Sequence, residues 1–207
     1  MRIILLDIGN VLLDVDFMPF CRAVCRDVES GAKQLMERYC QGELKELHDT
    51  GRIASLDFLR MIAADPLTRD LTLQQLRLAW QDIFTPTPDC ESAVGQLWQS
   101  YELWIMSDID PLHFAFLLDR FPILRNMDRY LLSYEHGHLK RSPEAFRYAL
   151  DLVGRDASEL LLIDDRQVNI DSCCTVGIES ILFQSWPETL ASPLLAARQS
   201  PAIERGA

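Results

Sequence analysis

Hydrophobic and polar positions divide the chain into two parts with different periodicity. In the first part, residues 17–84, apolar side chains recur every three or four positions, which predicts amphipathic helices and no strand. We expect these helices over residues 17–28, 32–40, 55–62 and 72–84. Ser55 fits the N-cap of the third helix, and Thr72 forms a capping-box pattern with Gln75 at the start of the fourth.

The rest of the chain alternates short, continuous apolar runs with helical segments. Pro143 after Ser142 is a typical helix start, and Gly154 is a typical helix end. Uninterrupted apolar strands separated by helices indicate a parallel sheet covered on both faces. The predicted fold class is therefore α/β, a doubly wound, Rossmann-like parallel sheet. Its strands are expected at residues 3–6, 103–106, 130–133, 160–163 and 179–183, and its helices at residues 90–99, 111–121, 143–153 and 170–175.

The helical part lies between the first and second predicted strands, so it is an all-helical insertion into the sheet. A segment with two prolines, residues 85–89, ends it, because prolines so close together cannot sit inside a helix. We predict that residues 1–16 and 88–207 form the core and that residues 17–87 form the inserted unit.

Composition narrows the classes of function. The formal charge of −11 argues against binding to nucleic acid or to an anionic membrane, because both need clustered Lys and Arg. No apolar run approaches the length of a membrane span, and no secretory leader pattern is present. The six cysteines lack paired C-x-x-C spacing, which favours reduced thiols in a cytoplasmic protein. We expect a small-molecule partner, and the sequence leaves the oligomeric state open.

Polar side chains follow three of the predicted strands at the point where each strand ends. Because the carboxyl ends of parallel strands meet at one edge of a sheet, these groups are expected to converge. Carboxylates crowded together repel one another, and Mg²⁺, a hard cation that prefers oxygen ligands, would allow them to stay ionised. Lys140, just before the helix start at Ser142, can balance further charge. The groups are Asp7, the pair Ser107 and Asp108, and the pair Asp164 and Asp165.

These residues resemble the motifs of the haloacid dehalogenase superfamily, a class of aspartate-nucleophile phosphatases and their relatives. The segment from Asp7 to Leu12 is similar to the first motif of that family, Ser107 to the second, Lys140 to the third, and Asp164 with Asp165 to the fourth. The insertion over residues 17–87 is similar in place to the helical cap that many members carry. The form D-x-G-N-V-L most resembles a bacterial branch that includes a glucose-1-phosphate phosphatase.

The resemblance implies a role for each residue. Asp7 would attack phosphorus and form an aspartyl-phosphate, while Ser107 and Lys140 would hold the phosphoryl oxygens. Mg²⁺ would be held by Asp7, the carbonyl of Gly9 and Asp165, with Asp164 acting through water or through another ligand. The predicted function is a magnesium-dependent phosphomonoesterase acting on a small phosphorylated metabolite, such as a sugar phosphate. Taken singly, Ser107, Lys140 and the acid pair also fit ordinary turn, loop and helix-start positions.

The chain departs from the family pattern at three positions. Gly9 stands where phosphatases of the family usually carry a second aspartate, the general acid and base; Asp14 and Asp16 are candidate substitutes, although both fit solvated acids. Asp108 replaces the usual asparagine, so a carboxylate would face the phosphate unless it caps the next helix. Arg141 replaces the proline that commonly follows the lysine.

Two other interpretations and one more residue complete the predictions. A 2-haloacid dehalogenase would use the same nucleophile without a metal, which would leave Asp164 and Asp165 idle. A catalytically weak or non-catalytic binding protein on the same scaffold would explain Gly9 and Asp108. Arg52, which follows Gly51 in the inserted unit, is a candidate contact for an anionic or hydroxylated substrate, and an exposed loop residue is an equal alternative.

Overall fold

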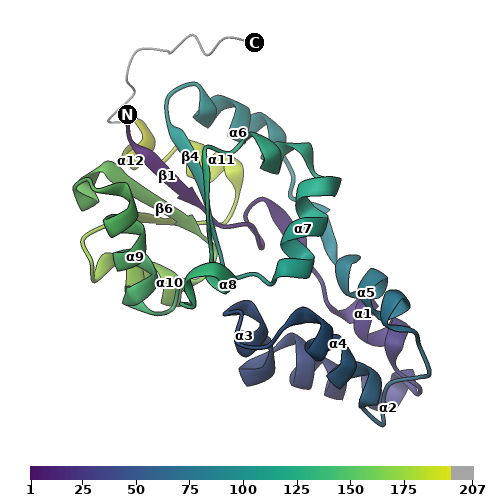
Figure 1. Cartoon of the computed structure of the whole chain (residues 1–207). Coiled ribbons are helices and arrows are strands. Elements are labelled where there is room, and N and C mark those ends of the chain that lie inside the picture. The colour runs from purple at the N-terminus through teal and green to yellow at the C-terminus, as the bar shows by residue number, and fades with distance from the viewer. Residues whose placement is uncertain (197–207) are drawn as a thin grey trace.

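The computed structural model describes residues 1–196 and contains a central sheet of five parallel strands (Figure 1). Every neighbouring pair in the sheet is parallel, and the order is β5-β4-β1-β6-β7. This confirms the predicted α/β class. The strands are β1 (Ile3–Leu6), β4 (Glu102–Ser107), β5 (Arg129–Leu132), β6 (Leu160–Asp164) and β7 (Glu179–Leu182).

Helices cover both faces of this sheet. Alternate side chains of β1 pack against different sets of helices. Ile4 and Leu6 belong to the apolar cluster that includes residues of α6 (Cys90–Trp98) and α7 (Pro111–Arg120). Ile3 and Leu5 point to the opposite face and join the cluster that includes α9 (Pro143–Val153) and α10 (Gln167–Cys174). A strand covered on both sides has no polar face, which explains why the β1 sequence is continuously apolar.

The predicted start and end of α9 are both confirmed. The helix begins at Pro143 after Ser142, and Gly154 ends it in the left-handed conformation, with φ of 63°. Several short elements were not predicted, because segments of three to five residues carry too little periodicity to be recognised. They are η2 (Pro122–Asn126), α8 (Ser133–His136), η3 (Ala157–Glu159), α11 (Trp186–Leu190) and α12 (Pro193–Ala196).

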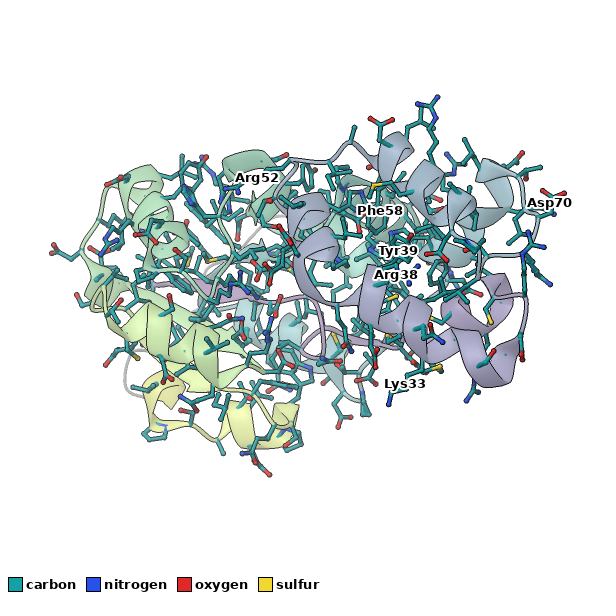
Figure 2. The ribbon with its side chains drawn as sticks, turned by 90° about the horizontal axis from the view of Figure 1, so that it is seen from below. Lys33, Arg38, Tyr39, Arg52, Phe58 and Asp70 are labelled. Carbon is teal, nitrogen blue, oxygen red and sulfur yellow. The ribbon has the colours of Figure 1, made fainter. Side chains whose placement is uncertain are left out.

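The inserted helices form a block with its own apolar core, beside the carboxyl edge of the sheet (Figure 1). Phe20, Phe58 and Trp80 are fully buried in this helical block, and Figure 2 shows Tyr39 beside Phe58, with ring centroids 6.1 Å apart. Its elements are α1 (Met18–Val24), α2 (Val28–Leu35), the π-helix η1 (Met36–Cys40), α3 (Gly42–Asp49), α4 (Ser55–Ala64) and α5 (Leu73–Gln81).

Two predictions about local structure in this block have different outcomes. The capping box is confirmed: Thr72 Oγ1 accepts from the N–H of Gln75 at 3.2 Å, and the Gln75 side chain accepts from the N–H of Thr72 at 2.9 Å. The N-cap prediction for Ser55 is wrong, because Ala54 holds that position. The Ser55 hydroxyl instead lies 3.1 Å from Nε2 of His48.

A small antiparallel pair of strands joins the helical block to the core. The two strands are β2 (Leu13–Val15) and β3 (Phe84–Pro86), in which Leu13 pairs with Pro86 and Val15 with Phe84. The expectation of no strand up to residue 84 is therefore wrong at its last residue. Pro86 is tolerated because each strand of a two-stranded ribbon has a free edge. Within residues 1–196, no helix combines the length and hydrophobicity needed to cross a membrane.

Candidate active site

The strand ends converge as predicted, at one edge of the sheet. Strands β4, β1 and β6 are neighbours, and Asp7 follows β1 while Ser107 and Asp164 end β4 and β6. A cavity of about 520 Å³ opens at this edge. It is lined by seven of the residues that the sequence singled out, namely Asp7, Gly9, Ser107, Asp108, Lys140, Arg141 and Asp165.

Lys140 lies between two carboxylates and is itself buried, with 2% of its surface exposed. Its Nζ is 2.6 Å from Oδ2 of Asp7 and 2.6 Å from Oδ2 of Asp164. Burial alone would lower the pKa of this ammonium, but the charges of Asp7 and Asp164 outweigh it and raise the pKa above its usual value. Lys140 is therefore a permanent cation at the bottom of the cavity.

The two acids beside Lys140 differ in their hydrogen bonds. Asp164 is fully buried, and its Oδ1 accepts from the N–H of Arg166 and from Nδ2 of Asn169, both at 2.9 Å. Burial opposes ionisation, but Lys140 and these donors keep the pKa of Asp164 below its ordinary value. Burial raises the pKa of Asp7 to about 7, helped by the charge of Asp164 and opposed by Lys140. Asp164 is thus the fixed anion of the pair.

Three carboxylates at this edge could share a cation. Oxygen atoms of Asp7, Asp164 and Asp165 lie within 4.8 Å of one another. Asp165 accepts from Nδ2 of Asn10 at 3.1 Å, and Asn10 adopts a positive φ of 54°. A set of hard oxygen donors with one lysine to balance three acids fits Mg²⁺.

Asp108 has a structural partner that the sequence did not indicate. Its Oδ1 accepts the backbone N–H of Lys140 at 2.9 Å, so this carboxylate holds the lysine loop. Burial raises the pKa of Asp108. The suggestion that Asp108 caps the next helix is wrong, because Asp110 is the N-cap of α7 and accepts from the N–H groups of Leu112 and His113 at 3.0 Å.

Besides the fully buried Asp164, three residues from the sequence do not line this cavity in the structure. Arg52 lines a neighbouring cavity of about 330 Å³, and Figure 2 places it where the helical block meets the core. Asp14 is an exposed residue of β2. Asp16 accepts the N–H of Met18 at 2.8 Å. Arg141, by contrast, lines both cavities and forms an ion pair with Glu46 of α3.

The sequence missed three charged residues that α3 contributes to the main cavity, namely Lys45, Glu46 and Asp49. Lys45 and Asp49, four residues apart on α3, both line it and form an ion pair, with side chains 12% and 10% exposed. Lys45 Nζ also lies 3.9 Å from Oδ2 of Asp110. The i,i+4 spacing of opposite charges was the available signal, but α3 itself was not predicted.

Comparison with known proteins identifies the family. The family model described as haloacid dehalogenase-like hydrolase matches residues 1–173, so this chain belongs to that family of hydrolases. Among curated proteins, it is 25% identical over 185 residues to D-ribitol-5-phosphate phosphatase of Bacteroides thetaiotaomicron, covering 86% of this chain and 89% of the relative.

Solved structures support the fold. A haloacid dehalogenase family enzyme of B. thetaiotaomicron, crystallised with magnesium and inorganic phosphate, has a TM-score of 0.77 at 20% identity, over 91% of this chain and 98% of that one. L-2-haloacid dehalogenase of Xanthobacter autotrophicus has a TM-score of 0.62 at 16% identity, over 97% and 85%. The same fold therefore occurs in a family enzyme crystallised with magnesium and phosphate and in a haloacid dehalogenase.

Proposed function

We propose that this hydrolase is a magnesium-dependent phosphatase that cleaves the monoester of a small phosphorylated polyol or sugar. The observation that carries this proposal is that Lys140 contacts both Asp7 and Asp164, at the carboxyl ends of β1 and β6, beside Asp165. The similarity to a D-ribitol-5-phosphate phosphatase supports a hydroxylated substrate.

In the proposed mechanism, a carboxylate oxygen of Asp7 attacks phosphorus and the ester oxygen leaves. Ser107 and Lys140 hold the phosphoryl oxygens, and the ammonium offsets charge that builds up in the transition state. Water then attacks the aspartyl-phosphate and releases inorganic phosphate. Mg²⁺, held by Asp7, the carbonyl of Gly9 and Asp165, with Asp164 nearby, would neutralise the negative charge of the phosphoryl group.

The two parts of the fold suggest two different roles. We propose that residues 1–16 and 88–207 act as the catalytic core and that residues 17–87 act as a cap, which supplies the wall of the cavity opposite Asp7. Lys45 and Asp49 belong to that wall. The rival function, 2-haloacid hydrolysis without a metal, leaves the charge of Asp165 without a counter-ion, and for that reason we favour the phosphatase.

The test is a turnover assay on 4-nitrophenyl phosphate and on a panel of sugar and polyol phosphates. We expect turnover that EDTA abolishes and added Mg²⁺ restores. Asp7→Asn should lower it by on the order of 10⁴-fold or more, because the nucleophile is lost. Asp14→Asn, an exposed acid seven positions away, is the matched control and should leave turnover unchanged. Halide release from 2-haloacids that survives EDTA would overturn the proposal.

A further inference from the structure

The cavity needs a proton donor that position 9 cannot supply. When an alkyl ester oxygen leaves phosphorus, it takes up a proton, and loss of that help typically costs about 10²–10⁴-fold in rate. Gly9 has no side chain, and neither Asp14 nor Asp16 lines the cavity. The donor must therefore come from another element.

Few acids lining the cavity are free for this task. Glu46 pairs with Arg141 in the open part of the cavity, where the two side chains are 36% and 50% exposed, unlike the largely buried Asp49. Asp165 accepts from Asn10 and belongs to the proposed cation site. Asp108 accepts the backbone N–H of Lys140 and so holds the loop that places the cation beside Asp7. Asp49 remains, and it reaches the cavity from the helical block.

We propose that Asp49 of α3 gives a proton to the leaving-group oxygen and then takes one from the attacking water. This inference rests on the proposed phosphatase function. It assigns to the helical block a catalytic residue, in addition to its role as a wall.

The charges around Asp49 allow its carboxyl to change protonation state. The charged groups that face it are Lys45 on its own helix and Asp110 and Asp108 from the core. Burial raises the pKa of Asp49 to about 6, although Lys45 opposes the shift. A carboxyl with a pKa near neutrality can both donate and accept a proton under working conditions.

Asp110 keeps Lys45 neutralised when Asp49 takes up a proton. Asp110 is fully buried, and besides the two N–H groups of α7 it contacts Nδ1 of His113 at 2.6 Å. Burial opposes its charge, but His113 and Lys45 hold the pKa of Asp110 well below its usual range. Because Asp110 stays ionised 3.9 Å from the ammonium of Lys45, protonation of Asp49 leaves no buried cation without a counter-ion.

Backbone contacts fix the end of α3 against the core. The carbonyl of Asp49 accepts from Oγ of Ser133, the first residue of α8, at 2.5 Å. Gly51 approaches the same helix so closely that a Cβ there would lie 2.5 Å from the carbonyl oxygen of Tyr134. The Asp49 carboxyl is thus held at a defined position relative to the ends of the strands.

The proton transfers balance over the cycle. In the first step the bond between Asp7 and phosphorus forms, the bond between phosphorus and the ester oxygen breaks, and that oxygen takes the proton of Asp49. In the second step water attacks phosphorus, its proton passes to Asp49, and the bond to Asp7 breaks. The products are the alcohol and inorganic phosphate, and both aspartates return to their starting states.

The experiment compares leaving groups. A polyol phosphate needs a proton on its leaving oxygen, whereas 4-nitrophenyl phosphate leaves as a stable anion. Asp49→Asn should lower kcat/KM, which reports the first step, by about 10²–10⁴-fold on the polyol phosphate and by less than about 10-fold on 4-nitrophenyl phosphate. Asp49→Glu should recover part of the loss, and Glu43→Gln, an exposed acid on the same helix, is the control.

The outcomes separate the two proposals. Equal losses of kcat/KM on both substrates, or no loss, would overturn the role of Asp49 and leave the phosphatase function standing. A selective loss of polyol phosphate turnover in Asp108→Asn, but not in Asp49→Asn, would assign the proton transfer to Asp108 instead. A wild-type chain that hydrolyses no phosphate ester with Mg²⁺ present would refute the proposed function itself. Retained turnover of the aryl substrate shows that the variant is folded.

Discussion

Two clusters in this molecule place a buried lysine between two carboxylates, and they differ in how they are held. The core cluster consists of Asp7, Lys140 and Asp164. The junction cluster consists of Asp49, Lys45 and Asp110, and it spans the helical block and the core. In each, one acid is fully buried and held by backbone N–H groups at the start of a helix, and the other lines the cavity.

In both clusters, the two acids beside the lysine have different pKa values. The anchored acids, Asp164 and Asp110, have pKa values below the ordinary range, mainly because neighbouring cations and donors outweigh burial. Burial raises the pKa of Asp7 to about 7 and of Asp49 to about 6. A lysine that already has one permanent counter-ion allows the second acid to react or to exchange protons.

The two clusters differ in how closely the lysine contacts its two acids and in which elements carry them. Lys140 touches both of its acids at 2.6 Å, and all three members of the core cluster belong to the sheet domain. Lys45 lies 3.9 Å from Asp110, and this contact depends on how α3 sits against the core. Damage to the core cluster should therefore affect every substrate, and damage to the junction cluster should affect only the steps that need a proton.

Replacing the two lysines by methionine should show the largest contrast. Lys140→Met should lower turnover of all phosphate esters by about 10²–10³-fold or more. It should also lower the free energy of unfolding by about 3–5 kcal/mol, because two buried carboxylates lose their cation. Lys45→Met should mainly affect polyol phosphates. The measurements are kcat on both substrates and urea unfolding with and without Mg²⁺.

A surface lysine provides the control for this pair. Lys33, labelled in Figure 2, has a side chain that is 83% exposed and lies 4.0 Å from Glu37. Lys33→Met should change neither turnover nor unfolding. If Lys140→Met and Lys45→Met gave the same pattern of losses across substrates, the contrast between the clusters would be wrong.

A carboxyl added at position 9 should take over the proton transfer that we assign to Asp49. We expect this effect on turnover to be smaller than that of Lys140→Met. A Cβ at Gly9 would meet only Cγ2 of Val15, at 3.5 Å, which is an ordinary contact. In the Asp49→Asn background, Gly9→Asp should raise turnover of polyol phosphates about 10-fold or more and barely change that of 4-nitrophenyl phosphate. Gly9→Ala is the control without a carboxyl, and an equal gain from it would contradict the explanation.

The smallest expected effect concerns the seating of α3. Gly51 and Gly154 both have positive φ, 69° and 63°, but only Gly51 has a neighbour where a Cβ would lie. Alanine at either position should cost about 1–2 kcal/mol from the left-handed backbone. Only Gly51→Ala should also lower turnover of polyol phosphates, because the clash with Tyr134 moves α3. Equal turnover in the two variants would show that Asp49 tolerates this shift.

The sequence predicts the core cluster much better than the junction cluster. Asp7 and Asp164 follow continuous apolar strands, so topology alone brings them together, and Lys140 precedes a clear helix start. Their metal and catalytic roles remain predictions. Arg52 was also selected from the sequence, and the structure places it in the neighbouring cavity.

The junction cluster left little trace in the sequence because its members come from elements that meet only in three dimensions. The helix that carries Lys45 and Asp49 begins at Gly42 with a positive φ of 70°, and its only leucines, Leu44 and Leu47, are partly buried. Ser55 looked like a helix cap, and its hydroxyl instead meets His48, a contact that no local pattern encodes.

The two-stranded ribbon of β2 and β3 has a consequence for how such proteins diversify. The chain leaves the core at Leu13 and returns at Pro86, and these residues are direct partners in the ribbon. A different insert grafted between them would meet the same pair of hydrogen-bonded ends, while the five-stranded sheet keeps its own separate packing. Under the proposed function, exchange of this one segment between relatives would transfer the contacts to the alcohol, along with any acid on it, without altering Asp7.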